Sequence, residues 1–161
     1  MAKKNKLEKK FSQSLKADEN LWGVKLHNNM LAHQTTVGDY WINYADRDYY
    51  EHLQSCVVEC KQVTLKDEKG RLAFKRLKQM HDLLAFEERF ESHHAFFCIA
   101  FLNLRWDDSE VYIIPVKIMK RFIDDWPMVS INRMEMRNKF GKYLVGYNNQ
   151  VIDLRFIRSF V

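Results

Sequence analysis

Apolar residues in this chain are gathered into short runs that are separated by polar segments. Four of these runs predict β-strands, at Val37–Tyr44, Gln54–Val63, Ala95–Leu104 and Glu110–Pro115. The run Ala95–Leu104 is apolar on both faces, which is typical of a central strand that is covered on both sides. Side chains of a strand alternate between its two faces, so each run also predicts which residues lie together.

Longer segments with helical spacing predict helices around these strands. Leu7, Phe11 and Leu15 recur every four residues and predict a first helix from about Lys3 to Asp18. Asn20–Thr36 is only weakly periodic, and we interpret it as a connection or a short extended excursion. Three more helices are predicted, at Arg71–Phe90 with the stripe Ala73, Leu77, Met80 and Leu84, at Val116–Asp124, and from a cap at Ser130 to about Lys139.

The order of these elements predicts an α/β fold with a mixed central β-sheet flanked by helices. A strand–helix–strand crossover implies at least one parallel pair of strands. Lys142–Tyr147 and Val151–Ile157 predict a terminal hairpin. With 161 residues, the chain is expected to form a single domain over residues 1–161.

The triplet Glu59-Cys60-Lys61 stands at the end of the second predicted strand, and its spacing places Glu59 and Lys61 on one face. Asp39 lies in the preceding strand, so pairing of the two strands as a hairpin brings the three side chains together. Two carboxylates and a backbone carbonyl form a hard, oxygen-rich site for Mg²⁺. A neighbouring lysine can orient a metal-bound water or help to deprotonate it, which is the equipment for phosphodiester hydrolysis.

Each of these residues also has a plainer interpretation. Glu59 and Lys61 can form an ordinary ion pair on a sheet face. Glu8 in the first helix can be a solvated carboxylate, unless that end of the helix packs near the site. Gln79 can be an ordinary polar helix residue, although a glutamine beside a crowded ionic site can bind a phosphate or a water without adding charge.

Composition and charge restrict the compartment and the partner. The net charge of +5, from 26 basic and 21 acidic residues, favours an anionic partner only mildly. No apolar run is long enough to cross a membrane, and no signal segment follows the basic start. Cys56, Cys60 and Cys98 are expected to be buried thiols of a reducing compartment, so we expect a cytoplasmic protein without a membrane partner.

Basic residues fall into two groups, one on the first helix and one after the Glu59–Lys61 triplet. We interpret them as phosphate contacts on both sides of the site, although solvated helix faces remain the alternative. The two groups are Lys3, Lys4, Lys6, Lys9 and Lys10, and Lys66, Lys69, Arg71, Lys75, Arg76 and Lys78.

The ordered set of Asp39 and Glu59-Cys60-Lys61 on successive strands resembles the PD-(D/E)XK nuclease superfamily. Within it, the chain is similar to RecU-type Holliday junction resolvases over Gly38 to Asp124, in a short and phage-like form. The further matching residues are Tyr40, Phe74, Gln79, the strand Ala95–Ile99, the strand Glu110–Pro115 and the amphipathic helix after it. Glu8 matches the acidic residue that the superfamily often carries in its first helix.

The resemblance implies a restriction-endonuclease-like core and a homodimer that nicks four-way DNA junctions in recombination and repair, in association with the nucleoid. It also implies Mg²⁺, for which Mn²⁺ can substitute. Asp39 and Glu59 would bind the metal with the Cys60 carbonyl. Lys61 would serve the attacking water, Gln79 would support the site, and Glu8 would be an outer or second metal contact.

Two features depart from the family pattern, and two other functions stay open. Gly38 stands at the position of the proline in the superfamily name, and Trp22–Thr36 is short for the projecting stalk that engages a junction centre in RecU-type resolvases. One alternative is another PD-(D/E)XK endonuclease that cuts duplex or flap DNA. The other is a DNA-binding scaffold without catalysis, against which the intact Asp39, Glu59 and Lys61 positions argue.

Overall fold

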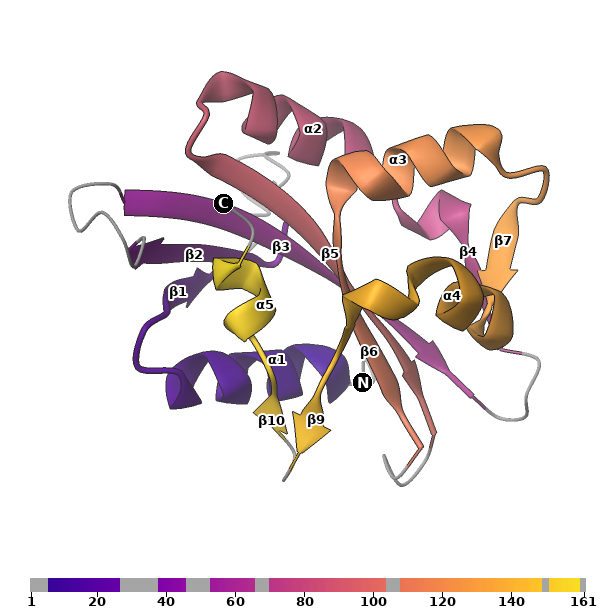
Figure 1. Ribbon diagram of the computed structural model, residues 1–161, viewed down its shortest axis with the longest axis horizontal. Helices are drawn as coiled ribbons and strands as arrows, with labels where there is room; N and C mark the ends of the chain where they lie inside the picture. Colours follow the sequence, from indigo (N-terminus) through magenta and orange to yellow (C-terminus); the bar gives the residue numbers. More distant parts are fainter. Residues whose placement is uncertain are drawn as a thin grey trace, which may run out of the picture.

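A computed structural model gives the fold, and it describes residues 6–26, 38–45, 53–65, 70–103, 108–148 and 151–159. Five α-helices are interspersed among the strands of the described chain (Figure 1). The helices are α1 (Lys6–Ala17), α2 (Met80–Arg89), α3 (Val116–Asp125), α4 (Arg133–Phe140) and α5 (Arg155–Arg158). The strands are β1 (Trp22–Lys25), β2 (Tyr40–Ala45), β3 (Leu53–Thr64), β4 (Arg71–Ala73), β5 (His93–Leu102), β6 (Glu110–Pro115), β7 (Ser130–Asn132), β8 (Leu144–Val145), β9 (Tyr147–Asn148) and β10 (Val151–Ile152).

The centre of the molecule is a mixed six-stranded sheet in the order β1-β2-β3-β5-β6-β8. β3 and β5 run parallel, and the other neighbours in this sheet are antiparallel. The predicted mixed sheet with a parallel crossover is therefore confirmed. β3 is the longest of these strands, and it continues past the point where β2 begins, which proves decisive for the site.

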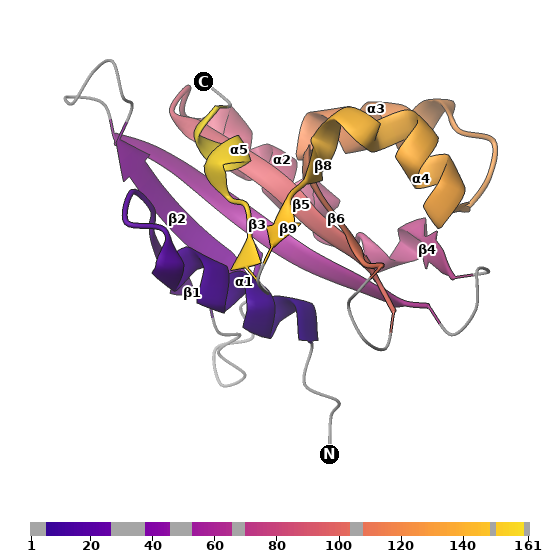
Figure 2. The ribbon, with the colours of Figure 1, turned by 60° about the horizontal axis from the view of Figure 1, so that its bottom comes forward.

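Helices cover both faces of this sheet and bury one apolar core on each side. α1 and α5 pack on one face over Cys56, Val58 and Cys60 of β3. α2, α3 and α4 pack on the other face, where Val57 and Val63 of the same strand are buried. Figure 2 shows α1 and α5 on one side and α3 and α4 on the other.

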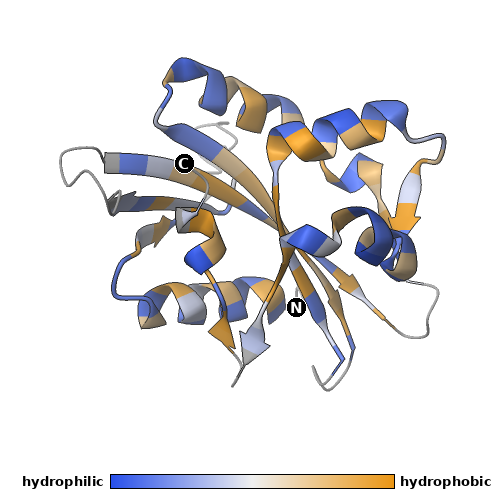
Figure 3. Ribbon diagram, in the orientation of Figure 1, coloured by the Kyte–Doolittle hydropathy of each residue, from blue (hydrophilic) through white to orange (hydrophobic). Residues whose placement is uncertain are grey.

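The inner strands are apolar on both faces because both are covered. Every described residue of β6 is buried, and β5 is buried from Ala95 to Leu102. Burying one large apolar side chain contributes about 1.5–3 kcal/mol, so these two strands anchor the fold. Figure 3 shows the hydrophobic colour concentrated along the crossing strands, with hydrophilic residues on the outer sides of α2 and α3. All three cysteines are buried and unpaired, as expected.

The predicted helix over Arg71–Phe90 is wrong in its first half. Residues 71–73 form β4, which pairs with β7 and places Leu72 opposite Ile131, and a 3₁₀ turn follows at Phe74–Arg76. Only Met80–Arg89 is α-helical. The helical spacing of the apolar residues was real, but pairing with a distant strand determines the conformation of residues 71–73.

Other element boundaries also differ from the prediction. Asn132, and not Ser130, caps α4, and it forms a capping box with Glu135. The predicted terminal hairpin is confirmed only at β9 and β10, because β8 joins the central sheet and α5 ends the described chain. Asn20–Thr36 contains the strand β1, while its residues 27–36 lie outside the described part, as do Lys3, Lys4 and the start of the predicted first helix. No helix among the described residues has the length and apolar character needed to cross a membrane.

A buried carboxylate, Glu110, ties β6 to α4. It accepts hydrogen bonds from Tyr112 Oη at 2.7 Å, Arg137 Nε at 2.8 Å and Arg133 Nη2 at 3.4 Å. Burial raises the pKa of the Glu110 carboxyl, but these three hydrogen bonds outweigh burial and hold the pKa below its usual value. The ionised carboxylate therefore stabilises the folded state.

We predict that Glu110→Gln lowers the free energy of unfolding by about 2 kcal/mol at pH 7, because two arginines lose a buried charge partner. A depressed folded pKa stabilises the fold above the unfolded pKa, and this contribution is lost as pH falls through the folded pKa. The difference from the wild type should therefore shrink below about pH 4 in urea titrations. Asp124→Asn, which removes an exposed ion pair with Lys120, is the control and should cost less than about 1 kcal/mol. Equal effects of the two variants at pH 7 would contradict this role of Glu110.

Candidate active site

Asp39 lies directly before β2, at the point where the pairing of β2 with β3 stops. Its amide donates to the Val58 carbonyl at 3.0 Å, and its own carbonyl accepts from the Leu26 amide at 2.8 Å. Its carboxylate Oδ2 accepts from the Cys60 amide at 2.7 Å. The Asp39 carboxylate thus takes the Cys60 amide of β3, which a main-chain carbonyl would accept from if β2 extended further along β3.

Glu59 and Lys61 lie on the face of β3 that α2 covers. Lys61 Nζ donates to Glu59 Oε1, and it lies 3.4 Å from Gln79 Oε1. Glu59 is only 3% exposed, so this ion pair is not a solvated surface pair. Gln79 occupies the position before α2 begins, so the structure brings it to Lys61 although the helix predicted around it was too long.

The Cys60 main chain completes this edge. The amide and carbonyl of one strand residue point to the same side, and the Cys60 amide points to Asp39. Its carbonyl therefore faces the same edge as the Asp39 carboxylate, as its predicted role requires. The Cys60 side chain is buried in the α1 core on the opposite face from Glu59.

Glu8 comes to this edge from the first turn of α1. Two contacts fix this end of the helix: the Tyr40 hydroxyl donates to the Glu8 carbonyl at 2.7 Å, and the Leu7 amide donates to Gln62 Oε1 at 3.1 Å. The condition set by the sequence, that this end of the helix packs near the site, is therefore met.

Lys25, on β1, is the site residue that the sequence did not reveal. Its Nζ lies 2.5 Å from Glu8 Oε2, and this hydrogen bond raises the pKa of Lys25. Lys25 pairs with Tyr40 in the sheet, so β1 places it beside the start of β2. The sequence predicts a connection or a short extended excursion for the segment that contains Lys25, and no local pattern indicates its pairing with β2.

Negative charge is concentrated at this edge. Burial raises the pKa of the Asp39 carboxyl, and the charge of Glu8 raises it further. Burial also raises the pKa of Glu59, and the charges of Asp39 and Glu8 raise it further. The ion pair with Lys61 lowers this pKa but does not cancel the rise. Within the described ranges, no three histidine, cysteine, aspartate or glutamate side chains are grouped closely enough to hold a metal ion by themselves.

The two basic groups flank the same stretch of β3. Arg76 Nη2 donates to the Gln62 carbonyl at 2.8 Å, while the start of α1 is bound to the Gln62 side chain. Arg71 is engaged by Ser130 and Glu135 instead. The predicted phosphate contacts that the structure describes are exposed or half-buried, and they are Lys6, Lys9, Lys10, Lys75, Arg76 and Lys78. Lys3, Lys4, Lys66 and Lys69 lie outside the described residues.

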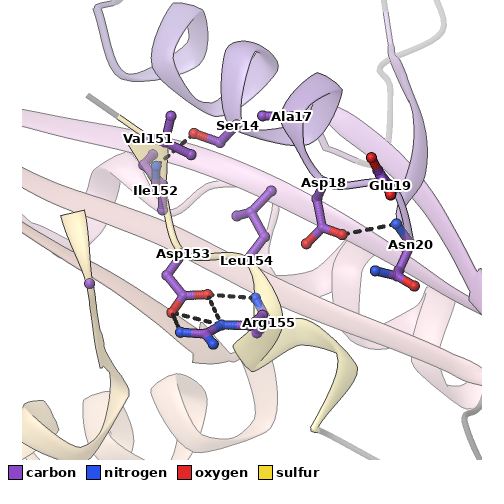
Figure 4. Close-up of a pocket in the computed structure, with 11 residues that line it drawn as sticks. Ser14, Ala17, Asp18, Glu19, Asn20, Val151, Ile152, Asp153, Leu154 and Arg155 are labelled. Carbon is purple, nitrogen blue, oxygen red and sulfur yellow. Dashed lines mark hydrogen bonds and ion pairs between the residues drawn. The ribbon is translucent and has the colours of Figure 1, made fainter. Parts of the chain in front are cut away.

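A hollow of about 620 Å³ lies elsewhere, between the end of α1 and the segment from β10 to α5 (Figure 4). Asp18 and the ion pair of Asp153 with Arg155 are among its lining residues. None of the predicted site residues lines it. The candidate site lies instead along the part of β3 that continues beyond its pairing with β2, where Glu59 is buried and Asp39 is half-buried.

No family model matches the sequence, and no curated protein matches it. Among solved structures, Hjc, a Holliday junction resolvase from the archaeon Archaeoglobus fulgidus, superposes with a TM-score of 0.41 and 12% identity. The match covers 82% of this chain and 93% of Hjc. Because the superposition is loose, any function has to be inferred from the site itself.

Gly38 sets the path of the chain into Asp39. Its φ of +131° is one that other residues rarely adopt and that the ring of proline forbids. A Cβ at this position would also lie 2.5 Å from Val57 Cγ1. The glycine is therefore a local requirement of this site and not a neutral replacement for proline.

We predict that Gly38→Ala destabilises the protein by about 2 kcal/mol, because of the backbone strain and the clash with Val57. Gly141→Ala is the matched control, since Gly141 has right-handed helical angles and no heavy atom within 4 Å of an added Cβ. Thermal unfolding of both variants tests this, and equal midpoints would show that Gly38 is not constrained.

Proposed function

We propose that this protein is a Mg²⁺-dependent, structure-selective DNA endonuclease that resolves Holliday junctions by paired nicks. The observation that carries the proposal is the convergence of Asp39, Glu59 and Lys61 at the start of β2, where its pairing with β3 stops and β3 continues. Acidic and basic side chains in this order, supported by Gln79 and Glu8, match the PD-(D/E)XK pattern stated from the sequence.

The donor set fits a hard divalent cation. Asp39 and Glu59 would hold Mg²⁺ together with the Cys60 carbonyl, and Glu8 would act as an outer contact. Burial raises the pKa of both carboxyl groups, and the charge of Glu8 adds to the effect on each, so a cation beside them would relieve an unfavourable charge. A bound Mg²⁺ supplies Lewis-acid stabilisation of the phosphate and a water of lowered pKa.

In this proposal Lys61 serves the attacking water. Its ammonium is held between a carboxylate and an amide oxygen, so its orientation is fixed before substrate arrives. An ammonium placed in this way can hold a water or hydroxide in line with a phosphate. Gln79 accepts from Lys61 and leaves its own amide group available to a phosphate oxygen.

The substrate is inferred from the charge around the site. Basic side chains of α1 and of the 3₁₀ turn stand on both sides of Gln62, so a phosphate backbone can cross the Glu59 region and contact both groups. A four-way junction has approximate two-fold symmetry, and a two-fold homodimer presents two active sites related in the same way. Trp22–Thr36 is the segment proposed to engage the junction centre.

Two alternative functions can be distinguished from a junction resolvase by the DNA substrates that the protein cuts. Another endonuclease of the same superfamily would share every catalytic residue and would differ only in cutting duplex or flap DNA. A binding scaffold would bind DNA but cut none of these substrates. A cleavage assay with junction, flap, duplex and single-stranded DNA, with and without Mg²⁺ or Mn²⁺, separates all three. Preferential, metal-dependent cutting of junctions supports the resolvase, and equal cutting of junction and duplex overturns it.

We predict that Asp39→Asn and Glu59→Gln each slow metal-dependent cleavage by at least about 100-fold, equivalent to about 2.7 kcal/mol of barrier. Both substitutions remove a metal ligand while keeping the shape of the side chain. DNA binding without metal should remain within a few-fold of wild type, because the basic groups are intact. Asp124→Asn on α3 is the control and should cleave normally. Wild-type rates in either site variant would refute the metal site.

Lys61→Arg should recover little of the activity lost in Lys61→Ala. The guanidinium is wider than the ammonium, does not readily release a proton, and has to fit between Glu59 and Gln79. Single-turnover cleavage rates with saturating DNA measure this directly. Full activity in Lys61→Arg would mean that the residue supplies only positive charge.

A further inference from the structure

Three large apolar side chains are exposed at the β1–β2 corner of the sheet. Trp22 is 64% exposed, Val24 68% and Trp41 39%. Val24 pairs directly with Trp41, and Trp22 lies two residues before Val24, so all three lie on one face. Exposed apolar residues that are grouped in this way mark a contact surface more often than scattered ones do.

Trp41 is held in a fixed orientation. Its Nε1 donates to Asn43 Oδ1 at 3.2 Å, and the same oxygen accepts from the Ser55 hydroxyl at 2.7 Å. Its ring meets Phe86 of α2 edge-on, with centroids 5.5 Å apart and an interplanar angle of 81°. The indole is therefore partly exposed and already ordered, so a ligand that stacks on it loses little entropy in ordering it.

This indole lies next to the candidate active site. Trp41 follows Asp39 by two residues on the same strand face, and it pairs with Val57 on β3. Glu59 is two residues beyond Val57 on the same face, and such diagonal neighbours are within reach of a large aromatic side chain. A nucleotide beside the scissile phosphate can therefore reach the ring.

We propose that Trp41, with Val24 and Trp22 beside it, is a stacking platform for an unpaired nucleobase of the DNA substrate. The inference rests on the proposed nuclease function and gives a physical source for its selectivity. Every base has an apolar π-face that stacks on an aromatic ring. In a continuous duplex those faces are already covered by neighbouring bases, whereas a branch point or a single-stranded arm exposes them.

Nucleobase binding accounts for the surface better than contact between two copies of the chain does. A contact between copies needs apolar area, and the ring of Trp41 offers a small, ordered area directly beside ionic groups. The site face also carries Lys61, and basic side chains flank the strand beyond it. An aromatic plane next to positive charge is the combination that binds single-stranded nucleic acid.

The test measures DNA binding without metal, so that cleavage does not interfere. Flap DNA and four-way junction DNA, each carrying 2-aminopurine at the branch, are titrated with wild type, Trp41→Ala, Trp41→Phe and Trp22→Ala, and a linear duplex serves as the reference. Trp41→Ala should weaken binding to the branched DNAs by about tenfold and remove the quenching of 2-aminopurine, with duplex binding unchanged. Trp41→Phe should keep most of the affinity and the quenching, because it preserves an aromatic ring.

Met134→Ala is the matched control, because Met134 is 73% exposed on α4, far from β1 and β2 (Figure 1). Unchanged binding to branched DNA in folded Trp41→Ala, or equal losses on branched and duplex DNA, would overturn the platform. If Trp41→Ala does not fold, the other two variants provide the test. Loss of quenching in Trp22→Ala, with quenching retained in Trp41→Phe, supports the platform. Unchanged quenching in Trp22→Ala overturns a platform formed jointly by Trp22, Val24 and Trp41. Sedimentation that changes from dimer to monomer in Trp22→Ala would assign the surface to a second copy instead.

The two proposals fail differently. Tryptophan-dependent binding of unpaired bases without any cleavage by wild type would leave the platform standing and remove the nuclease. Metal-dependent cleavage with the same junction preference in Trp41→Ala would leave the nuclease standing and remove the platform.

Discussion

The hydrogen bond from the Cys60 amide to the Asp39 carboxylate, at 2.7 Å, decides where the site forms. It uses a main-chain donor that β2 leaves available when its pairing with β3 ends. The same contact fixes the Asp39 side chain beside Glu59 and directs the Cys60 carbonyl to the same edge. Without the turn at Gly38, whose φ is +131°, the carboxylate could not reach this donor. The geometry of the candidate site and the end of the β2–β3 pairing therefore have one structural origin.

Contacts from α1, the 3₁₀ turn and the start of α2 bring the other site residues to this part of β3. Gln62, three residues beyond Glu59 on β3, accepts from α1 through its side chain and from Arg76 through its carbonyl. These two contacts bring Glu8 from one side and the basic turn from the other. The crossover through α2 delivers Gln79 to Lys61 as the chain passes from β3 to its parallel neighbour β5. Three segments separated in sequence thus meet on one strand.

Sequence alone predicted which residues lie together at the candidate site better than it predicted the surrounding elements. The alternation of side chains placed Glu59 and Lys61 together, and the hairpin arrangement brought Asp39 to them, because both follow from local periodicity. Lys25 escaped detection because β1 has only four residues and is defined by its pairing with β2. Residues 71–73 were misassigned because β4 exists only through β7, more than fifty residues later. Local patterns determine which face a side chain takes, whereas distant pairing determines which short segments become strands.

Crystals of the protein soaked in Mn²⁺, with data collected at the manganese absorption edge, test the metal site most directly. We expect one strong anomalous peak bound by the Asp39 and Glu59 carboxylates and the Cys60 carbonyl, with Glu8 close by. The same soak of Asp39→Asn crystals should lose the peak. No peak at this edge at millimolar Mn²⁺, or a peak only at the hollow beside Asp18 and Asp153, would contradict a metal-dependent active site at the start of β2.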